Sequence, residues 1–362
     1  MKKIPFKIDR NARENLPEQL ANGFREAILS GYYKPGERLP SFTQMVDELN
    51  VSIRAPRDAM KILQDANLVR SRPRIGCEVL ARDEHIWKGL VVVVVNAAYE
   101  GSYYISALIG AIRKTMLSEG YSFRLVTVDA GPRGRPDFAQ LDAVLSGPLS
   151  YVIAVYPDDR LARRILKSGK PALAYVDVQS GGGLETIRFS SVRNMVSIGK
   201  TISRSGVRKI VVAEYSGLPL FNQLCEKMGM ELEHLTVRPQ EGPRYLGSLK
   251  ERAMAAVIDR FGAKRNLPDL LLFSDDYVAF GGLVGLASCG IRIPDEMRVL
   301  TLSNVGFEPV YPVPLAQIRI DPRANGTAIA AKVLARIEGR PFSDPLPSPE
   351  FVAAASFPVP GG

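Results

Sequence analysis

A tight turn between two short helical patterns constrains this sequence more than any other feature. Apolar residues recur at helical spacing on both sides of the turn, over residues 41–49 and 52–66. Ser41 and Ser52 stand where the two helices would begin, and serine is a favoured N-cap residue. Asn50 lies between the helices and tolerates the left-handed backbone that a tight turn needs. The pattern therefore predicts two short helices joined by a tight turn.

The neighbouring segments complete a small domain around this turn. Residues 16–30 show helical spacing of apolar side chains, and Gly31 ends that pattern. Residues 68–71 and 77–80 indicate two short strands around a basic turn. Together these elements predict a winged helix-turn-helix, a fold that places one helix in the DNA major groove.

The distribution of charge agrees with this prediction. The net charge of the chain is +9. Residues 1–82 hold 15 Lys and Arg against 10 Asp and Glu, whereas the other 280 residues hold 32 against 28. More than half of the positive excess thus lies in less than a quarter of the chain. Such a distribution favours a nucleic-acid-binding domain attached to a near-neutral body.

The sequence pattern changes after residue 89. Leu90–Val95 is a run of apolar, mostly β-branched residues, which is typical of a buried parallel strand. Strand and helix patterns then alternate up to residue 176, and again between residues 194 and 302. Two successive α/β layers predict two lobes, and ligands of such sheets bind beyond the carboxyl ends of the strands.

These patterns define the predicted organisation of the chain. We expect an α/β protein with a winged helix-turn-helix over residues 1–82 and a linker over residues 83–89. Residues 90–362 are expected to form a doubly wound, two-lobed α/β domain that also dimerises. The chain length fits two or three domains.

The first domain resembles the GntR family of bacterial transcription regulators. The resemblance rests on four segments: PGERLPS (35–41), the LxVS turn (49–52), RDAMKIL (57–63) and RPRIGCEV (72–79). It implies binding to a double-stranded DNA operator. Because one winged domain covers only a half-site, we expect a homodimer on a pseudo-palindrome.

The body resembles the effector domain of the LacI family, which shares the fold of type I periplasmic sugar-binding proteins. Five segments carry the resemblance in the same order: residues 102–110, 169–177, 274–286, 290–296 and 321–330. The resemblance implies a periplasmic-binding-protein-like domain that holds a small-molecule effector, a sugar or sugar derivative, between its lobes.

Candidate DNA contacts follow from helix spacing and from the resemblance together. Arg54 and Arg57 lie three residues apart on one helix face, and Lys61 continues that face. Arginine donates to guanine O6 and N7 or to phosphate. The family usually has arginine where this chain has Thr43 and Ile53, so two expected phosphate contacts are missing or shifted by one residue. The full predicted set is Arg38, Ser41, Ser52, Arg54, Arg57, Lys61, Arg72 and Arg74.

Candidate ligand contacts combine polar groups with aromatic rings, because a sugar offers hydroxyl groups and an apolar ring face. By resemblance, Asp276 binds the effector from the second lobe, and its alternative role is to cap a helix. Of Tyr103 and Tyr104 in the first lobe, we expect one in the core and the other in the pocket. The full predicted set is Asn96, Tyr99, Tyr103, Tyr104, Asp177, Arg193, Asp275 and Asp276.

Other classes of protein find little support in the sequence. Three cysteines without partners at metal-ligand spacing favour a reducing compartment and argue against a disulfide framework or a metal site. The longest apolar run is too short to cross a bilayer, and no signal peptide is visible. There is no Walker A, GxSxG or HExxH motif. We therefore expect a cytoplasmic protein with no catalytic role, no cofactor and no membrane contact.

Three functions compete for this chain. The first is a dimeric transcription regulator, a repressor rather than an activator, controlled by a small ligand. The second is a ligand-independent DNA-binding protein whose body serves only for dimerisation. Ser190-Ser191 and Ser303-Asn304 keep the second function open, because they depart from the family's ligand-site pattern. The third is a solute-binding protein, against which the winged domain and the missing signal peptide argue.

Overall fold

The computed structural model divides into two compact units, residues 1–88 and residues 89–362. It describes residues 2–10, 15–29, 31–66, 68–72, 76–80, 88–99, 101–129, 136–176, 181–188, 192–215, 219–237, 245–341 and 346–358. The predicted linker at 83–89 stays a prediction, because residues 81–87 lie outside this set. Within the described residues, no helix is long and apolar enough to span a membrane.

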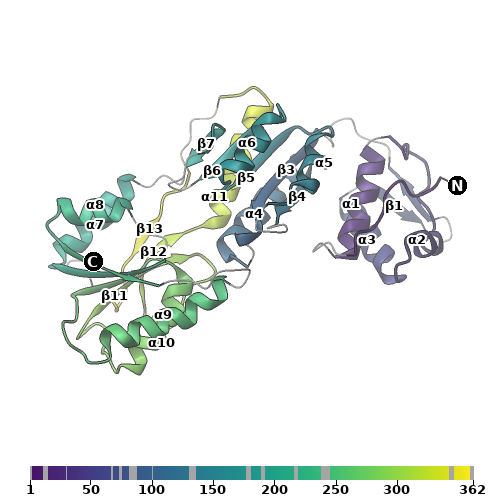
Figure 1. Cartoon of the computed structure of the whole chain (residues 1–362). Helices are drawn as coiled ribbons and strands as arrows, with labels where there is room; N and C mark the ends of the chain where they lie inside the picture. The colour runs from purple at the N-terminus through teal and green to yellow at the C-terminus, as the bar shows by residue number, and fades with distance from the viewer. Residues whose placement is uncertain are drawn as a thin grey trace. The chain divides into compact units, whose positions relative to one another are not determined.

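The described residues of the first unit form three helices and a two-stranded hairpin. Its elements are α1 (Leu16–Leu29), α2 (Phe42–Leu49), α3 (Arg54–Asp65), β1 (Val69–Arg72) and β2 (Gly76–Val79) (Figure 1). The strands pair antiparallel, with Val69 opposite Val79. Phe24, Met45 and Leu63, one from each helix, are fully buried in a shared core. This arrangement confirms the predicted winged helix-turn-helix.

The first lobe of the second unit is built on a five-stranded parallel sheet. In sheet order, the strands are β4 (Tyr121–Val128), β3 (Gly89–Asn96), β5 (Tyr151–Val155), β6 (Ala172–Val176) and β7 (Glu185–Arg188). Its helices are η1 (Ala97–Tyr99), α4 (Tyr103–Ser118), α5 (Ala139–Leu145), α6 (Asp159–Lys167) and α11 (Pro322–Ile337).

Both faces of this sheet are covered by helices, because its strands are apolar on both sides. Val91 and Val93 point to the face that α4 and α11 cover. Val92 and Val94 point to the opposite face, which α5 and α6 cover. Successive strand residues alternate between the faces, so one uninterrupted valine run supplies both cores.

The second lobe repeats this plan with one added strand. In sheet order, its strands are β13 (Glu350–Val352), β12 (Ala316–Ile320), β11 (Arg298–Asn304), β10 (Leu270–Phe273), β8 (Lys209–Glu214) and β9 (Glu231–Thr236). The edge strand β13 runs antiparallel to its neighbour β12. The helices are α7 (Val192–Arg204), α8 (Pro219–Lys227), α9 (Tyr245–Phe261) and α10 (Asp276–Ser288). Helices α9 and α10 cover one face, and α7 and α8 cover the other.

The chain passes between the lobes more than once. Helix α11 follows the second-lobe strand β12, yet it packs in the first lobe against α4 (Figure 1). Ile329 and Val333 of α11 share a core with Leu108 and Ile112 of α4. At Gly326, a Cβ atom would stand 2.3 Å from the Leu108 carbonyl oxygen, so only glycine permits this approach. The first lobe is thus completed by a late segment of the chain.

Candidate functional site

The turn between α2 and α3 has the geometry that the sequence predicted. Ser41 caps α2, since its hydroxyl oxygen accepts a hydrogen bond from the Gln44 amide at 3.2 Å. Asn50 ends α2 in the left-handed region, at φ 50°. Its amide donates to the Val46 carbonyl. This turn directs α3 away from α2 and leaves one face of α3 in solvent.

The start of α3 corrects one prediction. Ser52 does not cap the helix, because Ile53 occupies the N-cap position and already has helical backbone angles. Helix α3 begins at Arg54, one residue later than predicted, and the Ser52 carbonyl accepts from the Ala55 amide at 3.1 Å. The exposed Ser52 hydroxyl therefore remains available as a predicted DNA contact without a capping role.

Helix α3 separates its apolar and basic residues cleanly. Ala59 and Leu63 are fully buried. Arg54, Arg57 and Lys61 are exposed, and their spacing of three and four residues puts them on one helix face. The Nε of Arg54 lies 3.7 Å from an oxygen of Asp58, one turn later on the helix. The result is a solvent-facing basic row along the helix.

The hairpin carries a second basic surface. Arg38 and Arg70 both stand opposite Glu78, one on each side of strand β2. Arg72 lies two residues beyond Arg70 on the same strand face, and its Nε is 3.7 Å from an oxygen of Glu78. Arg38, Arg70 and Arg72 are exposed. Arg70 was missed, although the alternation in Val69-Arg70-Ser71-Arg72 could have indicated it. Arg74 lies outside the described residues.

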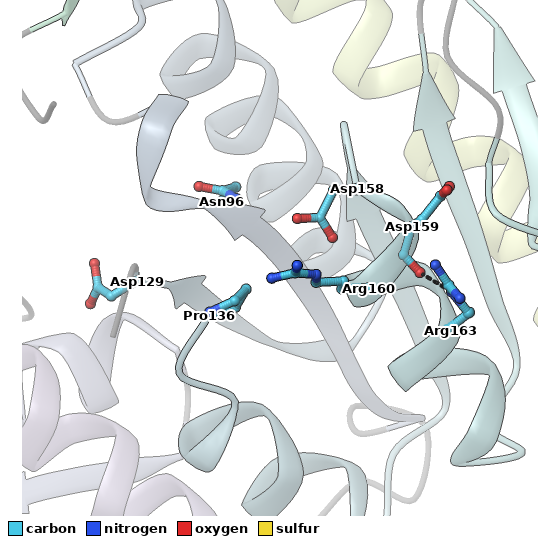
Figure 2. Close-up of a pocket in the computed structure, with 7 residues that line it drawn as sticks. All are labelled: Asn96, Asp129, Pro136, Asp158, Asp159, Arg160 and Arg163. Atoms are coloured by element: carbon cyan, nitrogen blue, oxygen red, sulfur yellow. Dashed lines mark hydrogen bonds between the residues drawn. The ribbon is translucent and has the colours of Figure 1, made fainter. Parts of the chain in front are cut away.

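The first lobe has a cavity of about 470 Å³ at the carboxyl ends of its strands. Asn96 ends β3, Asp129 follows β4, and Asp158 lies between β5 and α6. Strand order reverses between β3 and β5, and ligands of doubly wound sheets bind at such a point. Figure 2 shows the polar side chains that surround the cavity. The lining residues are Asn96, Asp129, Pro136, Asp158, Asp159, Arg160 and Arg163.

Local hydrogen bonds hold several of these groups in place. The Asp158 carboxylate caps α6 by accepting from the Leu161 amide at 2.7 Å. The Asn96 side-chain oxygen accepts from the Ala98 amide at 2.9 Å. Arg163 Nε donates to the Asp159 carbonyl at 3.0 Å (Figure 2). Carboxylate, amide and guanidinium groups therefore surround one cavity.

Four tyrosines form a cluster at the same end of the first lobe. The ring centroids of Tyr99 and Tyr156 are 5.4 Å apart, and those of Tyr156 and Tyr175 are 5.3 Å apart. The Tyr104 hydroxyl contacts that of Tyr175 and accepts from Asn325 Nδ2 at 3.0 Å. Burial raises the pKa of Tyr175 well above its usual value, so its phenol stays neutral. Tyr156 and Tyr175 were not predicted, since Tyr175 reads as an ordinary strand residue and Tyr156 directly follows a strand.

Tyr103 bridges the two lobes. Its hydroxyl donates to the Val305 carbonyl at 2.9 Å, and its ring stacks on Phe307 with centroids 4.9 Å apart. Tyr277 reaches back from α10, and its hydroxyl donates to the Gly101 carbonyl at 2.9 Å. The prediction assigned one of Tyr103 and Tyr104 to the core. Tyr104 packs against the first-lobe core, and Tyr103 lies at the junction between the lobes.

The two aspartates at the start of α10 have different roles. Asp275 is the N-cap, since its carboxylate accepts from the Tyr277 amide at 2.7 Å. The alternative role predicted for Asp276 therefore belongs to its neighbour. Asp276 is fully buried and accepts from the Asn304 amide at 3.0 Å and from its Nδ2 at 2.6 Å. Burial raises the pKa of Asp275 to about 6 and that of Asp276 to about 8.

Two predicted ligand residues have no described surroundings. Asp177 lies outside the described residues, and for Arg193 only the backbone, within α7, is described. The described ligand candidates fall into two groups. Asn96, Tyr99 and Tyr104 lie at the carboxyl edge of the first lobe, whereas Asp275 and Asp276 follow β10 in the second lobe. Tyr103 connects these two edges.

Comparison with known proteins agrees with this geometry. Residues 16–79 match the family of bacterial regulatory proteins called gntR, and residues 205–357 match the periplasmic binding protein-like domain. A relative from Pseudomonas aeruginosa, the HTH-type transcriptional regulator GntR, is 25% identical over 211 residues. That alignment covers 54% of this chain and 58% of the relative, so the chain spans a little over half of the relative's length.

Solved structures of LacI family regulators share the fold of the body. One is the regulator from Arthrobacter sp. FB24 in complex with lactose, with a TM-score of 0.60 and 16% identity over 74% of this chain and 99% of that one. Another is the lac repressor dimer bound to operator and the anti-inducer ONPF, with a TM-score of 0.59 and 17% identity over 74% and 93%. The chain therefore joins a winged helix-turn-helix domain of the GntR type to a two-lobed body with the LacI-type, periplasmic-binding-protein-like fold.

Proposed function

We propose that this protein is a transcription regulator that binds a specific DNA operator as a homodimer and is controlled by a small ligand. The observation that carries the proposal is the solvent-facing basic row of Arg54, Arg57 and Lys61 on α3. A helix presented after a tight turn, with arginines near its N-terminus, fits the geometry of major-groove recognition. We assign it a repressor role in the cytoplasm and no catalytic role.

Binding to DNA selected from a random duplex library tests this proposal. Arg57→Ala should weaken binding by about 1–3 kcal/mol, because it removes a base or phosphate contact. Lys167→Ala, which removes an exposed positive charge from α6 in the other unit, is the control and should leave binding unchanged. Wild-type affinity should fall steeply with salt. Unchanged binding by an Arg54→Ala/Arg57→Ala double variant would refute α3 as the recognition helix.

A homodimer is supported by the size of the first unit and by the surface of the second lobe. One winged domain covers only half of a pseudo-palindromic operator. Ile258 on α9 and Val284 on α10 are 39% and 53% exposed, which leaves apolar surface on this helix pair. Sedimentation of the full chain should give twice its 39.7 kDa mass. The proposed dimer would be contradicted if the free protein were monomeric and also bound the operator as a monomer.

We place the effector at the carboxyl edge of the first lobe, between the cavity and the tyrosine cluster. The cavity supplies polar groups for hydroxyls, and half-buried Tyr99 and Tyr156 supply aromatic faces. Lactose in the Arthrobacter neighbour supports a sugar or sugar derivative. A thermal-shift screen against a sugar library should identify the ligand. Arg160→Ala should then weaken its binding, and Lys167→Ala should not.

The effector must also change operator affinity if the two sites are coupled. Reciprocal linkage requires that DNA binding change ligand affinity by the same factor, with a coupling of roughly 1–3 kcal/mol. The competing function is a ligand-independent DNA-binding protein with a dimerising body. It is favoured by the internal bonds of Asp276 with Asn304 and of Tyr103 with Val305. The ligand-independent function would be favoured if the protein bound its operator and no sugar changed either its melting temperature or its operator affinity.

A further inference from the structure

Ile53 is exposed at a position where the helix does not need it. It directly precedes the first residue of α3, and its backbone already has helical angles. Its side chain makes no capping bond. It is 45% exposed and belongs neither to the core of the first unit nor to the residues packed against that core. The side chain of Ile53 is therefore not part of the core of the first unit.

Ile53 lies among exposed polar and basic residues. Exposed Ser52 precedes it, and exposed Arg54 and Arg57 follow it. The other large apolar side chain counted as exposed in the described part of this unit is Tyr32, at 37%. Tyr32 is held by a hydrogen bond from its hydroxyl to the Lys3 carbonyl at 2.9 Å. Ile53 is thus an apolar side chain at the entry to a basic surface.

DNA offers one apolar group to such a side chain in the major groove. That group is the C5 methyl of thymine, and apolar side chains recognise it by contact. A recognition helix places its first residues against the base edges. The arginines beside Ile53 match the charge of the phosphates on either side of the groove. Charge and apolar surface at the start of α3 are therefore complementary to one wall of the groove.

We propose that Ile53 contacts a thymine methyl and makes the protein prefer thymine at one position of each operator half-site. This inference rests on the proposed DNA-binding function. It assigns specificity to a position that the family resemblance associates with a phosphate-binding arginine. Isoleucine in place of arginine would replace a phosphate contact, which is the same for every DNA sequence, with a base contact that distinguishes thymine.

The test removes only the methyl group. Duplexes selected by the wild-type chain from a random library are remade with deoxyuridine in place of each thymine in turn. Deoxyuridine keeps the base pair and lacks the C5 methyl. When deoxyuridine replaces one particular thymine of each half-site, the wild-type protein should bind about fourfold more weakly than it binds the unmodified duplex. This is the loss expected for one buried methyl-sized group. Ile53→Ala should bind both duplexes equally at that position, whereas Ile53→Val should keep most of the preference.

The controls separate this proposal from the function on which it rests. If no sequence is enriched and binding does not respond to salt, the proposed DNA-binding function fails before deoxyuridine is used. If operators are selected but no thymine responds to deoxyuridine, or if Ile53→Ala responds as the wild type does, the assignment of Ile53 is wrong. Melting curves and sedimentation of Ile53→Ala complete the test. Weaker dimerisation together with an unchanged deoxyuridine response would place Ile53 in a protein interface and overturn the proposal.

Discussion

At the scale of single residues, Asp275 and Asp276 show how burial controls the chemistry of a carboxyl group. The Asn304 amide and side chain both donate to Asp276, which favours its charged form. Desolvation outweighs these bonds and raises the pKa of Asp276 to about 8. The pKa of Asp275 rises to about 6 for the same reason. Both groups are therefore easier to protonate in the folded chain than in the unfolded one.

Stability should consequently fall as the pH rises from 4 to 8. An unfolded aspartate loses its proton near pH 4. The folded chain keeps a proton on Asp276 up to about pH 8. The stabilising contribution is complete below about pH 4 and disappears as the pH passes through 8, with a slope of up to about 1.4 kcal/mol per pH unit from this group. Urea unfolding of the full chain at pH 5 and pH 8 measures the difference.

Asp276→Asn identifies the source of this dependence. The asparagine cannot ionise, so the difference in unfolding free energy between pH 5 and pH 8 should shrink. Asp159→Asn, at an exposed position on α6, is the matched control and should leave the difference as it is. An Asp276→Asn protein with the full wild-type dependence would show that another group titrates in this range.

At the scale of elements, the turn between α2 and α3 depends on the backbone of Asn50. This residue has φ 50°, in a region that costs residues with a Cβ roughly 1–2 kcal/mol but suits glycine and, to a lesser extent, asparagine. Asn50→Ala should therefore lower the stability of the first unit by about 1 kcal/mol. Asn50→Gly should be close to neutral. Urea unfolding monitored in the first unit measures both variants.

Equal stability of the alanine and glycine variants would contradict this account. Loss of the Asn50 side chain is common to both substitutions, so only the strain at a positive φ separates them. The Asn50 carbonyl accepts from Arg10 at 2.6 Å, and both variants retain that bond because it involves the main chain.

Elements with strong local patterns were predictable, and those defined by distant partners were not. The valine run of β3 and the paired helices of the head follow from periodicity alone. Strands β7, β12 and β13 are short, mixed in polarity and recognisable only beside their neighbours. For α11, the sequence showed a family match, but nothing local indicates that this late helix packs in the first lobe.

The same distinction applies to the candidate sites. Exposed Arg54 and Arg57 were predictable, because a helix face follows from spacing. The burial of Asp276 was not, since it depends on Asn304, which belongs to β11. The Ser52 cap was wrong because the helix starts one residue later, and a pattern cannot resolve a shift of that size.

At the scale of the whole molecule, the chain consists of two compact units. Limited trypsin digestion should cut in the stretch between them, which contains Arg82 and Lys88. A stable fragment of about 30 kDa is expected, which corresponds to residues 89–362 of the 39.7 kDa chain. Mass spectrometry of the digest locates the cut. Resistance of residues 81–89 at trypsin concentrations that cleave the denatured chain would count against an accessible linker.

The return of α11 to the first lobe also determines the order in which the parts of the protein can fold during synthesis. The head has all of its elements once residue 79 has left the ribosome, so it can fold early. The first lobe begins next, but α4 lacks its partner until residues 322–337 emerge, after almost the entire second lobe. A nascent chain stopped just before α11 thus carries a complete first unit joined to a lobe with an uncovered apolar face. We expect such an interrupted product to be a substrate for chaperones or proteases, because its apolar face remains exposed.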